Sequence, residues 1–155
     1  MGPAVTIEKE KFANGEPDLK NFVITVTPGD DSPWFGGKYR FKVNCPPQYP
    51  TAVFNVEIMD PVYHPNMDLV INGKPAKICL SLLRTEWRPA YGVKHLTYSL
   101  AGMFVAPNHA DPLNREAATL MRNDLAAFHK KVKETLKGGK FDFEEDKGVW
   151  FPKFS

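Results

Sequence analysis

Three side chains in this sequence could together perform acyl transfer: the thiol of Cys79, the amide of Asn66 and the carboxylate of Asp111. A thiol can accept an acyl group that is already activated as a thioester and then hand it to an amine. An asparagine amide is a suitable donor to the oxyanion that develops during the transfer. A nearby carboxylate with apolar walls can make a lysine a better nucleophile. This chemistry requires all three side chains to lie beside an accessible sulfur.

Each of these residues also has an ordinary structural explanation. A free cysteine in an apolar run such as "ICLSLL" (78–83) is more often a small hydrophobe of the core. Asn66 follows a proline and can be a turn residue, and Asp111 precedes Pro112 and can cap a helix. Cys45 ends a strand before two prolines, so we expect it to be structural. Spacing alone does not choose between the two interpretations of Cys79.

A cysteine hydrolase is a further possibility, because the chain has four histidines. Such an enzyme needs a histidine within hydrogen-bond reach of the cysteine and a third group that orients the histidine. His64 lies in a tight corner before a proline, where a structural hydrogen bond is the more common role. We find no recognisable pattern of base and orienting group around any of the four.

Length and charge limit the possible functions. The 155 residues fit one domain, with a core at about 18–139 and a C-terminal tail at 140–155. The 20 basic and 18 acidic residues are too balanced to indicate nucleic-acid or membrane binding. Two cysteines make neither a disulfide framework nor a metal pattern, and reduced thiols suit the cytoplasm or the nucleus. We see no signal peptide and no stretch near the roughly 20 apolar residues that span a bilayer.

Hydrophobic patterning predicts a sheet followed by helices. Residues 21–27, 38–43 and 53–59 alternate as half-buried strands do, residues 5–12 alternate weakly, and the short connections imply an antiparallel meander. The segment from 63 to 91 is rich in turn residues and is expected to be a long irregular loop.

Two helices are predicted after this loop. One covers residues 93–104, and a longer one begins with Asp111 as its N-cap and ends at Gly138-Gly139. The tail is expected to pack onto its own domain. The fold class is therefore α+β, with helices covering one side of an antiparallel sheet.

The order of several motifs resembles the ubiquitin-conjugating enzyme family. The motifs are "YHPN" (63–66), "ICLSLLR" (78–84), "WRPA" (87–90) and "APNHADPLNREAA" (106–118), with "GGKYRFKV" and "QYP" in the expected order upstream. The similarity runs from about residue 18 to residue 139. Within the family, "DLKNFVITVTP" (18–28), "ICLSLLR" and "LKGG" (136–139) are most similar to the conjugating enzymes of neddylation.

This resemblance implies a role for each candidate residue. Cys79 matches the cysteine that carries the modifier's C-terminus as a thioester, and Asp111 matches the acidic residue that positions the attacking lysine. Asn66 matches the motif asparagine that supports the oxyanion or holds the active-site loop. Three further groups of residues match other positions of the family. His64, Pro65 and Trp87 match residues that support the active site, and Tyr98 matches a helix position that faces the modifier. The loops that face the ligase are matched by Pro50, Thr51, Pro89 and Ala90.

The resemblance further implies a four-stranded meander sheet covered by helices on one side, here without the family's N-terminal helix. Between Asn66 and Cys79 the chain is several residues longer than typical relatives, with "LVINGKPAK" (69–77) as the surplus. We expect this insertion to form a wall beside the sulfur.

The implied function is transfer of a ubiquitin-like modifier, of the Nedd or Rub type, from an activating enzyme to Cys79 and then, with a ligase, to a substrate lysine. The activating enzyme consumes the ATP, so no bound cofactor or metal is expected, and the protein is expected to be a monomer. One alternative is the same enzyme serving ubiquitin. Another, of a different class, is a non-catalytic scaffold with the same fold.

Overall fold

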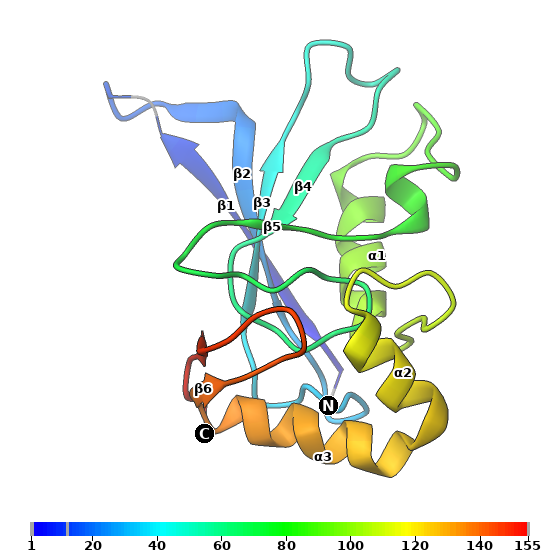
Figure 1. Cartoon of the computed structure of the whole chain (residues 1–155). Helices are drawn as coiled ribbons and strands as arrows, with labels where there is room; N and C mark the ends of the chain where they lie inside the picture. The colour runs from blue at the N-terminus through cyan, green and yellow to red at the C-terminus, as the bar shows by residue number, and fades with distance from the viewer. Residues whose placement is uncertain (1, 12, 155) are drawn as a thin grey trace.

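The computed structural model, which describes residues 2–11 and 13–154, contains one main antiparallel sheet (Figure 1). Its strands follow chain order, with each strand hydrogen-bonded to the next: β1 (Ala4–Lys11), β2 (Pro17–Thr27), β3 (Tyr39–Asn44), β4 (Asn55–Ile58) and the two-residue β5 (Ala76–Lys77). The four long strands are the predicted meander, which is confirmed. The weakly alternating first segment is therefore a strand, at the edge of the sheet.

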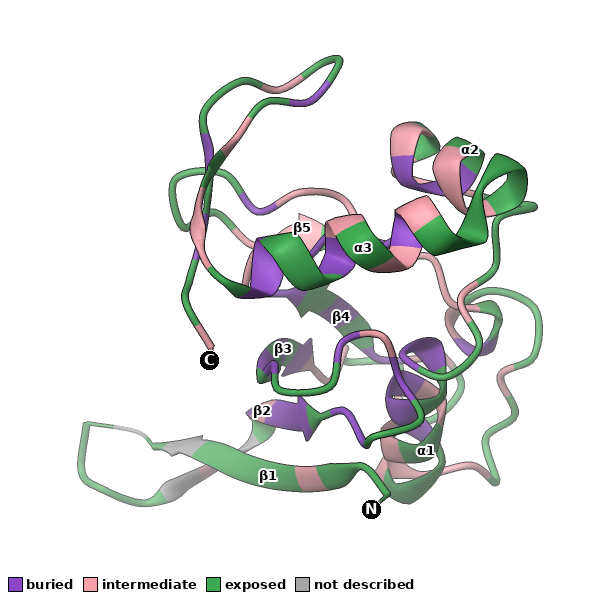
Figure 2. Ribbon diagram, turned by 90° about the horizontal axis from the view of Figure 1, so that it is seen from below, coloured by how far each residue is buried: buried purple, intermediate pink, exposed green. Residues whose placement is uncertain are grey.

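Alternation along the strands decides which side of the sheet faces the core. In β3, Tyr39, Phe41 and Val43 are buried, while Arg40 and Lys42 between them are exposed. This is the period-two pattern of a half-buried strand. Figure 2 shows buried residues on β2 to β4 and on the facing sides of the helices, whereas β1 is mostly exposed.

Within the described residues, three α-helices follow the sheet: α1 (Val93–Met103), α2 (Arg115–Asn123) and α3 (Leu125–Leu136). The first confirms the predicted helix at 93–104. None of the helices in the described residues is long and apolar enough to cross a membrane.

The prediction of a single long helix capped by Asp111 is wrong in two respects. The N-cap is Asn114, whose side chain accepts a hydrogen bond from the backbone N–H of Ala117 at 3.1 Å. The helix then breaks at Asp124, whose backbone is not helical (φ −153°, ψ 86°) and whose side chain caps α3. Since Ser, Thr, Asp and Asn all favour caps, α2 and α3 both begin at a residue with that preference.

An aromatic cluster fills the space between sheet and helices. Trp34 is fully buried, packs edge-on against Phe104 and Phe128, and donates from Nε1 to the carbonyl of Tyr63 at 3.1 Å. Tyr39 of β3 stacks on Phe104 with ring centroids 5.0 Å apart. Residues from the sheet, the connection before β3 and the helices thus share one core.

The C-terminal tail packs onto the same domain, as predicted. Two short strands, β6 (Gly139–Phe141) and β7 (Val149–Phe151), form a separate antiparallel pair. Phe143 between them is buried and stacks on Tyr63 at 5.6 Å, and Val149 and Phe151 are buried in the same core. The tail therefore supports the segment that leads directly into the His-Pro-Asn corner.

Residues 67–78 form a hairpin, so the prediction of a long irregular loop is wrong over this part. Met67 pairs with Ile78, and the backbone N–H of Asp68 donates to the carbonyl of Lys77 at 2.9 Å. At the tip, Asn72 and Gly73 have φ of 53° and 75°. Positive φ at both central residues is the geometry of the tight turn that Asn-Gly favours.

Candidate active site

Cys79 lies at the end of this hairpin with its thiol partly exposed. Its backbone N–H donates to the carbonyl of Asn66 at 2.8 Å, and the short 3₁₀ helix η1 (Ser81–Leu83) then turns the chain. The thiol lines a cleft of about 250 Å³, whose other lining residues are Asn66, Leu80, Ser81, Arg84, Ser99, Gly102, Met103, Ala106, Asn108 and Asp111. The apolar run is thus not a core strand that seals the sulfur.

Asp111 reaches the sulfur from the loop after α1. The thiol of Cys79 donates to Asp111 Oδ2 at 3.6 Å, and the guanidinium of Arg84 forms an ion pair with the same oxygen. The structure therefore brings together Cys79 and Asp111, as predicted, and adds Arg84. Sequence reasoning gave Arg84 no role, although it is the only cation in the "ICLSLLR" motif.

The groups around the sulfur shift the pKa of the Cys79 thiol in opposite directions. Burial raises the pKa of the Cys79 thiol, Arg84 lowers it, and the Asp111 carboxylate raises it, so that the net effect is upward. The hydrogen bond and charge of Arg84 lower the pKa of Asp111, and so does the Cys79 thiol. At neutral pH the thiol is therefore protonated and the carboxylate is ionised.

Asn66 joins the two segments that carry these groups. The residue is only 5% exposed, and its side chain donates from Nδ2 to the carbonyl of Asn108 at 2.7 Å and accepts from the backbone N–H of Asn108 at 2.9 Å. A longer contact of 3.5 Å joins Nδ2 to the carbonyl of Asp111. The resemblance implies that Asn66 either supports the oxyanion or holds the active-site loop. These hydrogen bonds are those of a residue that holds the loop.

His64 is a buried structural residue. Its Nδ1 accepts from the backbone N–H of Asn66 at 2.9 Å, and Nε2 donates to the carbonyl of Met103 at 2.7 Å. The ring is fully buried and stacks on Trp34 at 4.6 Å. Burial lowers the pKa of His64 to about 4, partly offset by the bond to Met103, so the imidazole is neutral.

Pro65 connects the corner to the loop that carries Asp111. Its carbonyl accepts from the backbone N–H groups of both Leu113 and Asn114, at 2.9 and 3.1 Å. Because these bonds hold the chain before α2 out of the helix, Asp111 stays in the loop instead of capping the helix.

A cysteine hydrolase requires a histidine beside its cysteine. In the described part of the chain, none of the residues that line the Cys79 cleft is a histidine.

The two loops predicted to face a ligase lie side by side. Trp87 donates from Nε1 to the carbonyl of Pro50 at 2.9 Å, and its ring packs edge-on against Phe54 at 5.5 Å. Thr51, Pro89 and Ala90 are exposed. On α1, Tyr98 is 66% exposed. These residues are accessible, and their roles stay predictions.

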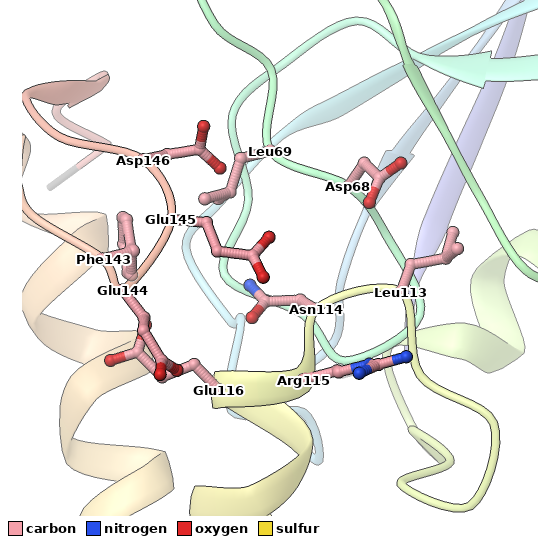
Figure 3. A pocket seen from close by; sticks show the side chains of 10 residues that line it. All are labelled: Asp68, Leu69, Leu113, Asn114, Arg115, Glu116, Phe143, Glu144, Glu145 and Asp146. Carbon is pink, nitrogen blue, oxygen red and sulfur yellow. The ribbon is translucent and has the colours of Figure 1, made fainter.

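The insertion does not form a wall beside the sulfur, so that prediction is wrong. None of residues 67–78 lines the Cys79 cleft. Asp68 and Leu69 instead line a separate cavity of about 380 Å³, together with the start of α2 and the acidic tail residues Glu144, Glu145 and Asp146 (Figure 3). Among the described residues, no group of three or more His, Cys, Asp or Glu side chains could hold a metal ion.

Known proteins are similar to this chain in both sequence and fold. The sequence profile described as "Ubiquitin-conjugating enzyme" matches residues 4–136. The chain belongs to the ubiquitin-conjugating enzyme family. Members of this family are transferases, and the fold predicted from the resemblance is the one observed.

Several similar proteins carry names from one branch of this family. A probable NEDD8-conjugating enzyme, Ubc12-like, of Arabidopsis thaliana is 36% identical over 131 residues, covering 84% of this chain and 68% of that protein. The NEDD8-conjugating enzyme UBC12 of Yarrowia lipolytica is also 36% identical, covering 84% of this chain and 69% of its own length. The chain thus spans about two thirds of these relatives. Among solved structures, S. cerevisiae Ubc12 superposes with a TM-score of 0.77 at 26% identity, covering 99% of this chain and 78% of that one.

Proposed function

We propose that this protein conjugates a Nedd8-type modifier, carrying it as a thioester on Cys79 and passing it, with a ligase, to a substrate lysine. The observation that carries the proposal is the partly exposed sulfur of Cys79 in a cleft with the Asp111 carboxylate 3.6 Å away. The names of the similar proteins from Arabidopsis and Yarrowia support the choice of modifier.

Loading is a thioester exchange at Cys79. The thiol loses its proton, and the thiolate attacks the thioester carbonyl that joins the modifier's C-terminus to a cysteine of the activating enzyme. A new carbon–sulfur bond forms at Cys79, the earlier one breaks, and the activating enzyme's cysteine leaves as a thiolate that takes up a proton. The energy comes from ATP consumed by the activating enzyme, so we propose no cofactor for this chain.

Discharge transfers the same acyl group to nitrogen. The uncharged amine of a substrate lysine attacks the thioester carbonyl, an amide bond forms, and Cys79 leaves as a thiolate. Asp111 orients the incoming amine and favours loss of its proton to solvent. Asn66 maintains this arrangement, because its side chain fixes Asn108 in the loop that carries Asp111. We further propose that these steps occur in the cytoplasm or nucleus.

Charging of the protein tests the proposal. Incubation with a Nedd8-type modifier, its activating enzyme and ATP should give an adduct that thiols cleave. Cys79→Ser should abolish the thiol-sensitive adduct, whereas Cys45→Ser, which changes the other cysteine, should retain it. Absence of any adduct with the unsubstituted protein would contradict the proposal. If ubiquitin's activating enzyme charges the protein and the Nedd8-type activating enzyme does not, the modifier is ubiquitin. If neither activating enzyme charges it, the scaffold interpretation remains.

Asp111 should act mainly on discharge and much less on loading. Asp111→Ala is expected to slow transfer to free lysine on the order of 100-fold, the lower part of the range for positioned acid–base groups, with a much smaller effect on thioester formation. Since Asn114 caps α2, this substitution removes no helix cap. Single-turnover gel assays of loading and of discharge would measure both steps. Equal slowing of the two would exclude a specific role in activating the amine.

A further inference from the structure

One oxygen atom of Asp111 serves two partners. Oδ2 accepts from the Cys79 thiol at 3.6 Å and is also the atom that the Arg84 guanidinium contacts. The Arg84 and Asp111 side chains are 56% and 59% exposed, so the ion pair lies at the open mouth of the cleft. Apart from Cys79, these two residues are the only ionisable groups among the described residues that line the cleft.

We propose that Arg84 is a positioning residue: it offsets the charge of Asp111 beside Cys79 during loading and then yields Asp111 to the substrate lysine during discharge. The second half of this statement rests on the proposed function. The first half concerns only the sulfur and its two charged neighbours, and it can be tested without any modifier.

During loading, the sulfur must become negatively charged next to a carboxylate that is already ionised. Two like charges at this separation disfavour each other, and a cation on the same carboxylate reduces that cost. Arg84 is placed to do so, because it follows η1 and its backbone N–H donates to the carbonyl of Ser81 at 3.1 Å. The short helix thus fixes the start of the Arg84 side chain within reach of Asp111.

During discharge, the sulfur is bonded to the modifier and carries no proton. Asp111 is now needed to orient the substrate amine. A lysine that approaches the thioester presents a cation or an amine to Asp111, where Arg84 is already bound. An exposed ion pair of this kind contributes little to stability, so one cation can replace another at Asp111 with little change in free energy. Arg84 therefore competes with the substrate, and it does so at the oxygen that faces the sulfur.

Alkylation of Cys79 tests the first half. In a Cys45→Ser background, the rate of reaction with iodoacetamide is measured against pH for the unsubstituted site, Arg84→Gln and Arg84→Lys. Arg84→Gln should shift the midpoint to higher pH and slow alkylation about threefold to tenfold at a fixed pH below it, the equivalent of half to one pKa unit. Arg84→Lys should restore most of the rate. Arg122→Gln removes an exposed arginine at the end of α2 and is the matched control.

An unchanged midpoint in Arg84→Gln would overturn the proposal, as would an equal shift in Arg122→Gln. A urea titration of each variant would show whether the fold is intact. Discharge of the loaded protein to free lysine tests the second half: Arg84→Gln should lower the lysine concentration that gives half the maximal rate, and an unchanged or higher value would overturn that half. If no thioester forms at all, the proposed function fails, while the alkylation result still decides the role of Arg84 at the sulfur.

Discussion

Burial of His64 makes the stability of this fold sensitive to mild acid. The ring is fully buried and neutral, with both nitrogens bonded to backbone groups, and its pKa falls from an ordinary 6.5 to about 4. Between these two values the unfolded chain binds a proton that the folded chain does not. The free energy of unfolding therefore rises with pH in this range. The part of it that depends on a neutral His64 ring is lost as the pH falls from 6.5 through 4.

The size of the effect follows from the same two values. One pKa unit corresponds to 1.36 kcal/mol, so His64 alone should remove about 3 kcal/mol of stability between pH 7 and pH 4. His64→Gln keeps a donor that can reach the carbonyl of Met103 but has no titrating ring. Its own loss of stability over the same pH range should be smaller by about 3 kcal/mol, since carboxylates elsewhere contribute equally to both proteins.

Urea unfolding at pH 7 and pH 4, followed by tryptophan fluorescence, would measure this difference. His109→Gln removes an exposed histidine and serves as the control. If His64→Gln lost as much stability in acid as the unsubstituted protein, the reasoning would be refuted. Should that variant be too unstable to compare, an NMR titration of the His64 ring in the unsubstituted protein gives the same answer, because its signals should not move above pH 5.

Two further predictions concern stability alone. Asn114→Ala should reduce the free energy of unfolding by about 1 kcal/mol, because it removes the cap of α2, whereas Asp111→Ala should leave that contribution in place; urea titrations that showed the reverse would restore Asp111 as the cap. Phe143→Ala should cost about 3 kcal/mol, because its buried ring stacks on Tyr63; a loss below 1 kcal/mol in the same assay would mean that the tail contributes little to the fold.

Local pattern predicted the sheet and α1 because in both the buried residues recur at a fixed period. The break at Asp124 escaped prediction because the apolar stripe continues across it, from Leu120 and Met121 of α2 to Phe128 of α3. A pattern of side chains cannot report a change in backbone direction when the residues on both sides still face the same core. The local signal is the pair Asn123-Asp124, since both residue types favour helix caps.

The hairpin at 67–78 was missed although its turn is visible in the sequence. Asn72-Gly73 is a strong hairpin signal, but the flanking residues do not alternate clearly, and proline follows closely. Pairing with β4 settles the structure here: Ala76 and Lys77 complete the edge of the sheet. That pairing is a contact between distant segments, which local reasoning does not reach.

Cys79 and Asp111 were identified from their motifs, whereas Arg84 was not, and the reason is physical. The role of Arg84 depends on a contact with Asp111 across the cleft, between segments that no local periodicity relates.

Hydrogen bonds of Asn66 keep the loop-rich region around the sulfur ordered. Asn66 binds the backbone of Cys79 through its carbonyl and the backbone of Asn108 through its side chain. One buried residue therefore fixes the sulfur relative to the carboxylate, and this is how a site built on loops can keep a defined geometry without regular secondary structure.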